Sequence, residues 1–307
     1  MKFISLALCA AAAAMTWMFP AAAIEKGAKA VVKDPKAAAA VRVPYLNHFN
    51  AADDGRGLVN AYLCAGLSKA AYTRKDFHDY AEKGGAARRD FHREKTTDTE
   101  WGIVEMPHVV LLVFRGSEGK LAINDLTDWY HDSNAQLHGA KHWGGGKVHR
   151  GFARVADSVF ADVSSTTALY SGARKPVFIC GHSLGGALAT LVAFRLTEKI
   201  ANVRGLYTYG SPRVGDKDFR KAFEAKGLVY GRWVNDRDPA PILPPQWLHL
   251  YQIGKMHRLK SGSGATLDSS ANYNFDPRQI SDHYMDNYLK KLWAVIPAHQ
   301  QALLPKP

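Results

Sequence analysis

The chain of 307 residues is poor in cysteine, with only Cys9, Cys64 and Cys180. Their spacing fits no metal or redox motif, and the sequence also lacks H-E-x-x-H, a phosphate-binding loop and G-x-G-x-x-G. It therefore predicts no metal and no cofactor. Cys64 and Cys180 each lie in an apolar stretch, where buried thiols are common. We expect both to be free thiols, although export would permit a disulfide between them.

Long hydrophobic runs are also missing after residue 24, which predicts no transmembrane segment in the mature chain. Before that point, Lys2 precedes an apolar run that ends in Pro20-Ala21-Ala22-Ala23. This pattern is typical of a secretory signal peptide over residues 1–23, although a membrane anchor has a similar length. We expect a linker or pro-segment at 24–43, one globular domain at 44–297 and a tail at 298–307. The protein is then secreted, either to the periplasm or to the exterior.

Acidic residues are fewer than basic ones, 28 against 40, which gives a formal net charge of +12. A basic surface attracts anionic lipid headgroups, acidic polymers or nucleic acid. The basic residues are scattered, however, and form no dense block interleaved with aromatic residues. We therefore expect no nucleic-acid partner.

Short apolar segments predict buried strands, and they alternate with segments of helical pattern. The strands are expected at 109–114, 177–180, 206–209 and 231–234, and the helices at 60–72, 152–170, 186–199, 216–226 and 282–294. This alternation indicates an α/β fold with a mostly parallel central sheet and helices on both faces. Residues 73–100 are polar and variable in pattern, and no element is assigned to them.

The expected strand at 177–180 leads into Gly181-His182-Ser183-Leu184-Gly185 and then into an apolar helix. This is G-x-S-x-G between a strand and a helix, where glycines permit a sharp turn that exposes a nucleophilic serine. The sequence therefore predicts Ser183 as a nucleophile. The N–H of Leu184, at the helix start, is positioned to stabilise an oxyanion.

A serine nucleophile needs a base, and in this arrangement the acid and then the histidine follow the serine in the chain. Asp236 and Asp238 follow the strand at 231–234, and spacing alone leaves both as candidates. Asp216 and Asp218 instead fit a helix cap and a first turn.

Among the later histidines, His283 lies where a loop enters the last helix and is the favoured base. His249 fits a strand, His257 a solvated basic face, and His299 a poorly ordered tail.

Together these residues resemble the class 3 lipases, an α/β-hydrolase family, over roughly residues 58–290. The resemblance rests on five motifs: Val113-Phe114-Arg115-Gly116-Ser117 with Asp128-Trp129, Val148-His149-Arg150-Gly151-Phe152, Gly181 to Gly186, Thr208 to Gly215, and Asn235 with Asp238-Pro239-Ala240-Pro241. The family's D-H-x-x-x-Y setting is similar to Asp282-His283 with Tyr288.

The resemblance implies an α/β-hydrolase fold and a catalytic triad of Ser183, Asp238 and His283. It also implies an oxyanion hole formed by Ser117 and Leu184. The family further implies a lid, here at 118–128, with Leu121, Ile123 and Leu126 as its apolar face.

We therefore expect a secreted serine hydrolase that cleaves carboxylic esters of lipids, such as a triacylglycerol lipase or a related esterase. The same site also suits short-chain or aryl esters of the feruloyl type, or a phospholipase A1. A non-catalytic protein that binds lipid or polyanions on the same fold is the alternative from another class. It is supported only by the basic charge.

Overall fold

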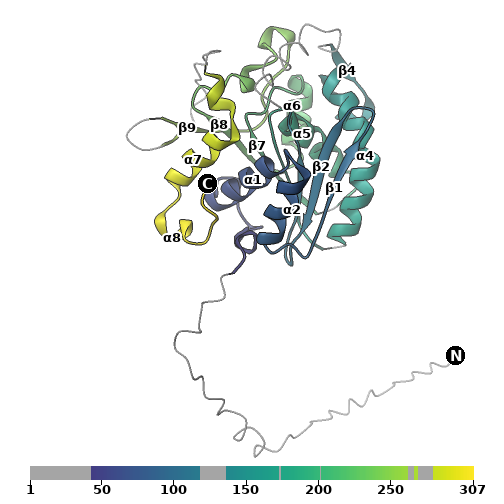
Figure 1. Ribbon diagram of the computed structural model, residues 1–307. Coiled ribbons are helices and arrows are strands. Elements are labelled where there is room, and N and C mark those ends of the chain that lie inside the picture. The colour runs from purple at the N-terminus through teal and green to yellow at the C-terminus, as the bar shows by residue number, and fades with distance from the viewer. Residues whose placement is uncertain (1–42, 118–135, 173, 201, 262–265, 269–278) are drawn as a thin grey trace, which may run out of the picture. The chain divides into compact units, whose positions relative to one another are not determined.

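The computed structural model describes residues 43–117, 136–172, 174–200, 202–261, 266–268 and 279–307 (Figure 1). The expected signal peptide and nearly all of the expected linker lie outside these residues. The expected lid at 118–128 and the Asp128-Trp129 motif also lie outside them.

The described residues form an eight-stranded sheet with strand order β1-β2-β3-β6-β7-β8-β9-β10. Strands β3, β6, β7, β8 and β9 pair in parallel, and β1, β2 and β10 add antiparallel ladders at the two edges. The predicted mostly parallel sheet is thereby confirmed. The strand bounds are β1 Arg88–Glu94, β2 Thr99–Glu105, β3 Val110–Phe114, β6 Val177–His182, β7 Val203–Tyr209, β8 Val229–Asn235, β9 Met256–Lys260 and β10 Thr266–Asp268. A separate ladder joins β4 (Leu137–Gly139) to β5 (Lys147–His149).

Helices cover both faces of the sheet, as the apolar strands require (Figure 1). Alternate residues of β3 point to opposite faces, so Val110, Leu112 and Phe114 join one buried cluster, and Leu111 and Val113 join the other. The first cluster packs against α4 (Arg150–Ser171), α5 (Leu184–Leu196) and α6 (Lys217–Glu224). The second packs against α1 (Leu58–Ala70), α2 (Arg74–Lys83) and α7 (Met285–Val295).

Residues 73–100, to which the sequence assigned no element, contain α2, β1 and the start of β2. The hydroxyl of Thr73 caps α2 by accepting a hydrogen bond from the Asp76 N–H. Strand β1 is an edge strand, and Phe91 is its one buried residue. Charged edge strands discourage pairing with other chains, and here that charge removed the alternating pattern on which prediction depends.

The C-terminal tail does not match the expectation of poor order. Residues Ala298–Gln301 form α8, and the Gln301 amide donates hydrogen bonds to the carbonyl oxygens of Trp293 and Ile296. Leu304 is buried, and the Tyr62 hydroxyl donates to the Pro305 carbonyl oxygen over 2.7 Å. The tail is ordered because it packs against α1 and α7, which the sequence pattern could not indicate.

Cys64 on α1 and Cys180 on β6 are both buried free thiols, as predicted. Burial is the main cause that raises the pKa of Cys64 well above its ordinary value, and the neighbouring Cys180 thiol adds to it. The pair lies where α1 packs on β6, and Cys180 is three residues before Ser183 in the sequence.

Candidate active site

Ser183 occupies a sharp turn between β6 and α5, with φ of +56° and ψ of −127°. Such a backbone is strained for a residue with a side chain and is common at functional sites. The turn depends on its glycines: a Cβ at Gly181 would overlap the backbone of Gly185, and one at Gly185 would overlap the carbonyl oxygen of Phe114. The Ser183 N–H donates to the Tyr209 carbonyl oxygen over 2.9 Å, which fixes the turn to β7.

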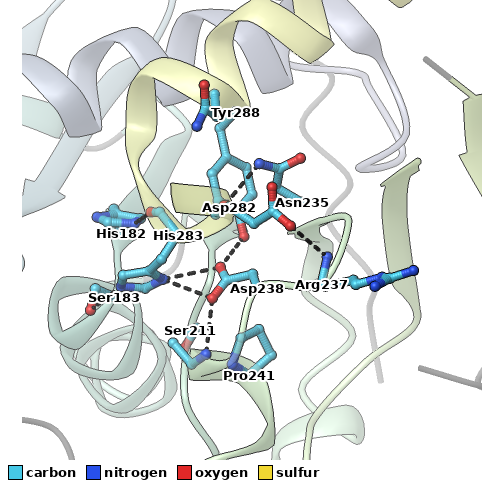
Figure 2. A network of polar contacts seen from close by, with 12 residues as sticks. His182, Ser183, Ser211, Asn235, Arg237, Asp238, Pro241, Asp282, His283 and Tyr288 are labelled. Carbon is cyan, nitrogen blue, oxygen red and sulfur yellow. Dashed lines mark hydrogen bonds and ion pairs between the residues drawn. The ribbon is translucent and has the colours of Figure 1, made fainter. Parts of the chain in front are cut away.

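Ser183, His283 and Asp238 form one hydrogen-bonded chain (Figure 2). The Ser183 Oγ lies 2.9 Å from His283 Nε2, and His283 Nδ1 lies 2.9 Å and 3.0 Å from the two Asp238 carboxylate oxygens. All three residues are buried, at 0%, 1% and 0% relative exposure respectively. The histidine is thus positioned to take the serine proton while the carboxylate holds its other nitrogen.

The Asp238 carboxylate follows β8 and accepts further hydrogen bonds. The Ala240 N–H donates over 2.9 Å and the Tyr288 hydroxyl over 2.6 Å. Burial by itself would raise the pKa of Asp238, but the adjacent His283 and these donors outweigh it and lower the pKa below its ordinary value. The group is therefore a buried anion, able to stabilise a positively charged His283.

A second layer of contacts joins the histidine loop to the aspartate loop. The Asn235 amide donates to the Asp282 carbonyl oxygen over 2.8 Å, and the Arg237 N–H donates to the Asp282 carboxylate over 3.2 Å (Figure 2). These bonds connect the segment after β8 to the segment before α7. They hold Asp238 and His283 in register although the two lie 45 residues apart in the chain.

His182, the residue before Ser183, contacts the site in a way that the sequence analysis did not predict. Its Nε2 lies 2.7 Å from the His283 carbonyl oxygen, which can only accept, so Nε2 carries the proton. Its Nδ1 is then the acceptor for the Tyr72 hydroxyl at 2.6 Å. Burial, with a smaller contribution from His283, lowers the pKa of His182 to about 3. The motif itself gave the signal, because its first variable position is a histidine.

Ser117 and Leu184 both line one small cavity of about 190 Å³. Leu184 is the first residue of α5, where the N–H groups have no partner within the helix. Ser117 follows β3, which pairs in parallel with β6. The two residues expected to form an oxyanion hole thus line the same cavity, next to the elbow at Ser183.

The structure places the other candidates away from the serine. Asp236 has positive φ and turns outward, where it forms ion pairs with Arg258 and Lys291. Asp216 caps α6 by accepting from the Phe219 N–H, as predicted.

Two expectations about histidines were wrong. His249 is not in a strand but ends a 3₁₀-helix at Gln246–Leu248, with φ of +61°. The helical turn interrupts the alternation that the sequence indicated. His257 is not solvated but buried in β9, with its ring 5.0 Å from that of Trp233. A parallel neighbour, β8, covers it, although the residues around it in the sequence are basic.

Within the described part of the chain, no group of three or more His, Cys, Asp or Glu side chains is arranged to hold a metal ion. The same residues contain no helix that is both long and apolar enough to cross a membrane.

Residues 111–247 match the family model described as lipase (class 3). A lipase of Rhizomucor miehei is 32% identical over 166 residues, which are 52% of this chain and 44% of the relative. Secreted mono- and diacylglycerol lipase A of Penicillium cyclopium is 28% identical over 61% of this chain and 60% of its own length. The sequence matches thus span about half the length of these curated relatives.

Among solved structures, the Rhizomucor miehei triacylglyceride lipase superposes with a TM-score of 0.60 at 25% identity. The superposition covers 74% of this chain and 93% of that one. Both the elbow around Ser183 and the loop that carries Asp238 lie within the matched residues. The predicted α/β-hydrolase fold is confirmed, and the resemblance to the class 3 lipases is confirmed over residues 111–247.

Proposed function

We propose that this protein is a secreted serine hydrolase that cleaves the carboxylic esters of lipids through an acyl-enzyme. The observation that carries the proposal is the buried chain from Ser183 Oγ through His283 to Asp238, with each link at 2.9 Å. Such a constellation converts a weakly nucleophilic hydroxyl into an attacking group. The lipid substrate class is supported by the family and by the names of the relatives.

In the first step Ser183 Oγ attacks the ester carbonyl carbon while its proton moves to His283 Nε2. Asp238 stabilises the resulting imidazolium, and the N–H groups of Ser117 and Leu184 donate to the oxyanion. The bond between the carbonyl carbon and the alcohol oxygen then breaks, and the leaving oxygen takes the proton from Nε2. In the second step water attacks the acyl-enzyme by the same route and releases the carboxylic acid.

The experiment compares hydrolysis of p-nitrophenyl butyrate and p-nitrophenyl palmitate by the mature protein and by Ser183→Ala. Turnover of palmitate that is lost in the variant supports a lipase. Turnover of butyrate alone supports an esterase for short chains.

Labelling by a fluorophosphonate provides the second readout. Labelling of the parent that disappears in Ser183→Ala supports this nucleophile. Labelling that survives in Ser183→Ala contradicts the assignment. Failure of both turnover and labelling would favour the non-catalytic, lipid-binding alternative.

The secreted location belongs to the same proposal. It rests on the sequence pattern of residues 1–23 and on a relative whose name describes it as secreted. Mass spectrometry of the N-terminus of the protein recovered from periplasm and medium tests it. Recovery of an intact Met1 inside the cell contradicts it.

A further inference from the structure

Trp247 is 74% exposed, more than any other aromatic side chain that the structure describes. It lies in the 3₁₀-helix at Gln246–Leu248, in the loop that follows Asp238. An indole in this position leaves much of its largely apolar surface, about 150–250 Å² in all, in contact with water. Single apolar residues are common on protein surfaces, so the surroundings of Trp247 decide whether it has a role.

The loop that carries Trp247 is fastened on both sides to the segment after β7. The Arg213 N–H donates to the Leu243 carbonyl oxygen over 2.7 Å, and the Tyr251 N–H donates to the Gly215 carbonyl oxygen over 2.8 Å. Trp247 is four residues from each of these two anchors in the sequence. The indole is therefore presented by a supported loop and not by a free end of the chain.

Other apolar side chains accompany Trp247 in the same loop and are only partly buried. They are Ile242, Leu243, Pro245 and Leu248. The sequence from 243 to 255 contains no aspartate or glutamate. The loop therefore offers water several apolar side chains and no negative charge of its own.

Two cations lie beside the end of this loop. Lys217 Nζ is 5.3 Å from the centre of the Tyr251 ring, and the central guanidinium carbon of Arg220 is 5.8 Å from it. The stretch 213–221 contains four basic residues and two acidic ones, and one of those acids, Asp216, is used as the cap of α6. The surroundings of the loop are thus positive as well as apolar.

The same loop is joined to the surroundings of the catalytic acid. The Gln252 amide donates to the carbonyl oxygens of Ser211 and Pro241, over 3.0 Å and 2.6 Å. Figure 2 shows Ser211 and Pro241 beside Asp238. A surface that holds Trp247 against a partner would therefore hold that partner close to the part of the protein that contains the triad.

We propose that the loop at 242–251, together with Lys217 and Arg220, binds the surface of an anionic phospholipid membrane, with Trp247 in the headgroup layer. Tryptophan favours that layer because its ring is apolar and its N–H remains near water. Basic side chains beside it are attracted by anionic headgroups, whereas the centre of a protein–protein interface is depleted of lysine. The proposal rests on the proposed function for its purpose, but membrane binding can be measured without turnover.

The test measures co-sedimentation of the mature Ser183→Ala protein with vesicles, so that the lipid stays intact. The vesicles contain phosphatidylcholine and phosphatidylglycerol in equal amounts. Adding Trp247→Ser should lower the partition coefficient at least about 10-fold, because the indole no longer leaves water. Leu169→Ser is the matched control, because Leu169 is also 74% exposed but lies on α4. It should leave binding nearly unchanged.

Lys217→Gln and Arg220→Gln test the electrostatic part of the proposal. Each should weaken binding to the anionic vesicles roughly 5-fold and have little effect on vesicles of phosphatidylcholine alone. Arg204→Gln is the control, because Arg204 is exposed at the amino end of β7, at the other edge of the sheet. Added salt should weaken binding of the Ser183→Ala protein to the anionic vesicles, since it screens exposed charges.

The proposal is overturned if the Ser183→Ala protein does not bind the anionic vesicles, or binds them no better than phosphatidylcholine. Equal binding after Trp247→Ser, in a variant whose thermal melt shows a folded protein, also overturns it. So does light scattering that shows a dimer before Trp247→Ser and a monomer after it, since the loop would then bind a second copy. Failure of the proposed function is recognised separately, as absence of Ser183-dependent hydrolysis of p-nitrophenyl butyrate.

Discussion

The His182 imidazole donates from Nε2 to the carbonyl oxygen of His283 over 2.7 Å, and the two rings lie 4.5 Å apart. The residue before the nucleophile therefore holds the backbone of the residue proposed as the general base. Through Nδ1 it also connects the site to Tyr72, just beyond the end of α1.

Replacing His182 by Phe retains a ring but removes both hydrogen bonds. Each is worth about 1 kcal/mol, so we expect kcat to fall roughly 10- to 100-fold with little change in KM. Tyr72→Phe removes only the outer bond and should cost less. Initial rates on p-nitrophenyl butyrate measure both. Equal activity of His182→Phe and the parent would show that His283 is held without this contact.

The two neighbouring carboxylates provide a matched pair of variants. Asp238→Asn removes the buried charge that faces His283, and we expect a loss in kcat on the order of 10⁴-fold. Asp236→Asn weakens the ion pairs with Arg258 and Lys291, which lie outside the chain from Ser183 to Asp238, so it should retain most activity. Steady-state kinetics with a melt for each variant distinguish the two. The reverse order would transfer the acid role to Asp236.

Tyr288→Phe tests the hydroxyl that donates to Asp238 over 2.6 Å. The buried carboxylate loses one donor, so we expect unfolding free energy to fall by about 1–3 kcal/mol and kcat to fall roughly 10-fold. Tyr209→Phe is the control, because that hydroxyl donates to the Ala61 carbonyl oxygen, away from the triad. It should lower stability but leave kcat near the parent value. Urea unfolding and initial rates give both quantities, and a similar kcat for the two variants counts against a role for Tyr288.

The buried histidines make stability depend on pH. Burial lowers the pKa of His149 to about 4, whereas the unfolded chain has the ordinary value of about 6.5. Between these values the unfolded state binds the proton and the folded state does not, so stability is lost as pH falls from about 6.5 toward 4.

His149→Asn keeps a cap for α4 but does not titrate, since asparagine also accepts from the Phe152 N–H. The parent should lose about 2 kcal/mol more than the variant between pH 7 and pH 5, at 1.36 kcal/mol per unit. Urea unfolding at the two pH values measures the difference. Parallel losses in the two proteins would mean that His149 titrates normally.

Local patterns predicted the central part of the molecule well. The buried strands around β3 and β6 were visible as continuous apolar runs, and the turn at Ser183 as glycines at fixed spacing. Strand β1 was not predicted, because an edge strand with many charged residues has no apolar pattern to detect. The order in the tail at 298–307 comes from contacts with α1, which local sequence does not encode.

The choice between Asp236 and Asp238 shows the same limit. Spacing left both open, and the family resemblance favoured Asp238. In the structure the backbone conformation separates the two residues. Asp236 has φ of +40°, and its side chain pairs with Lys291. The Asp238 side chain instead points inward and contacts Tyr288 and His283. A turn of this kind cannot be derived from residue types alone. The link from His182 to His283 likewise joins residues 101 positions apart and depends on the tertiary fold.

The two buried thiols, Cys64 and Cys180, allow the separation of α1 from the sheet to be measured. Both thiols are buried between α1 and β6, so a water-soluble thiol reagent reaches them only when that helix separates from the sheet. Because β6 leads directly into the turn at Ser183, the labelling rate measures how often α1 separates from the strand that positions this serine. The wild-type sequence thus needs no added probe for that motion.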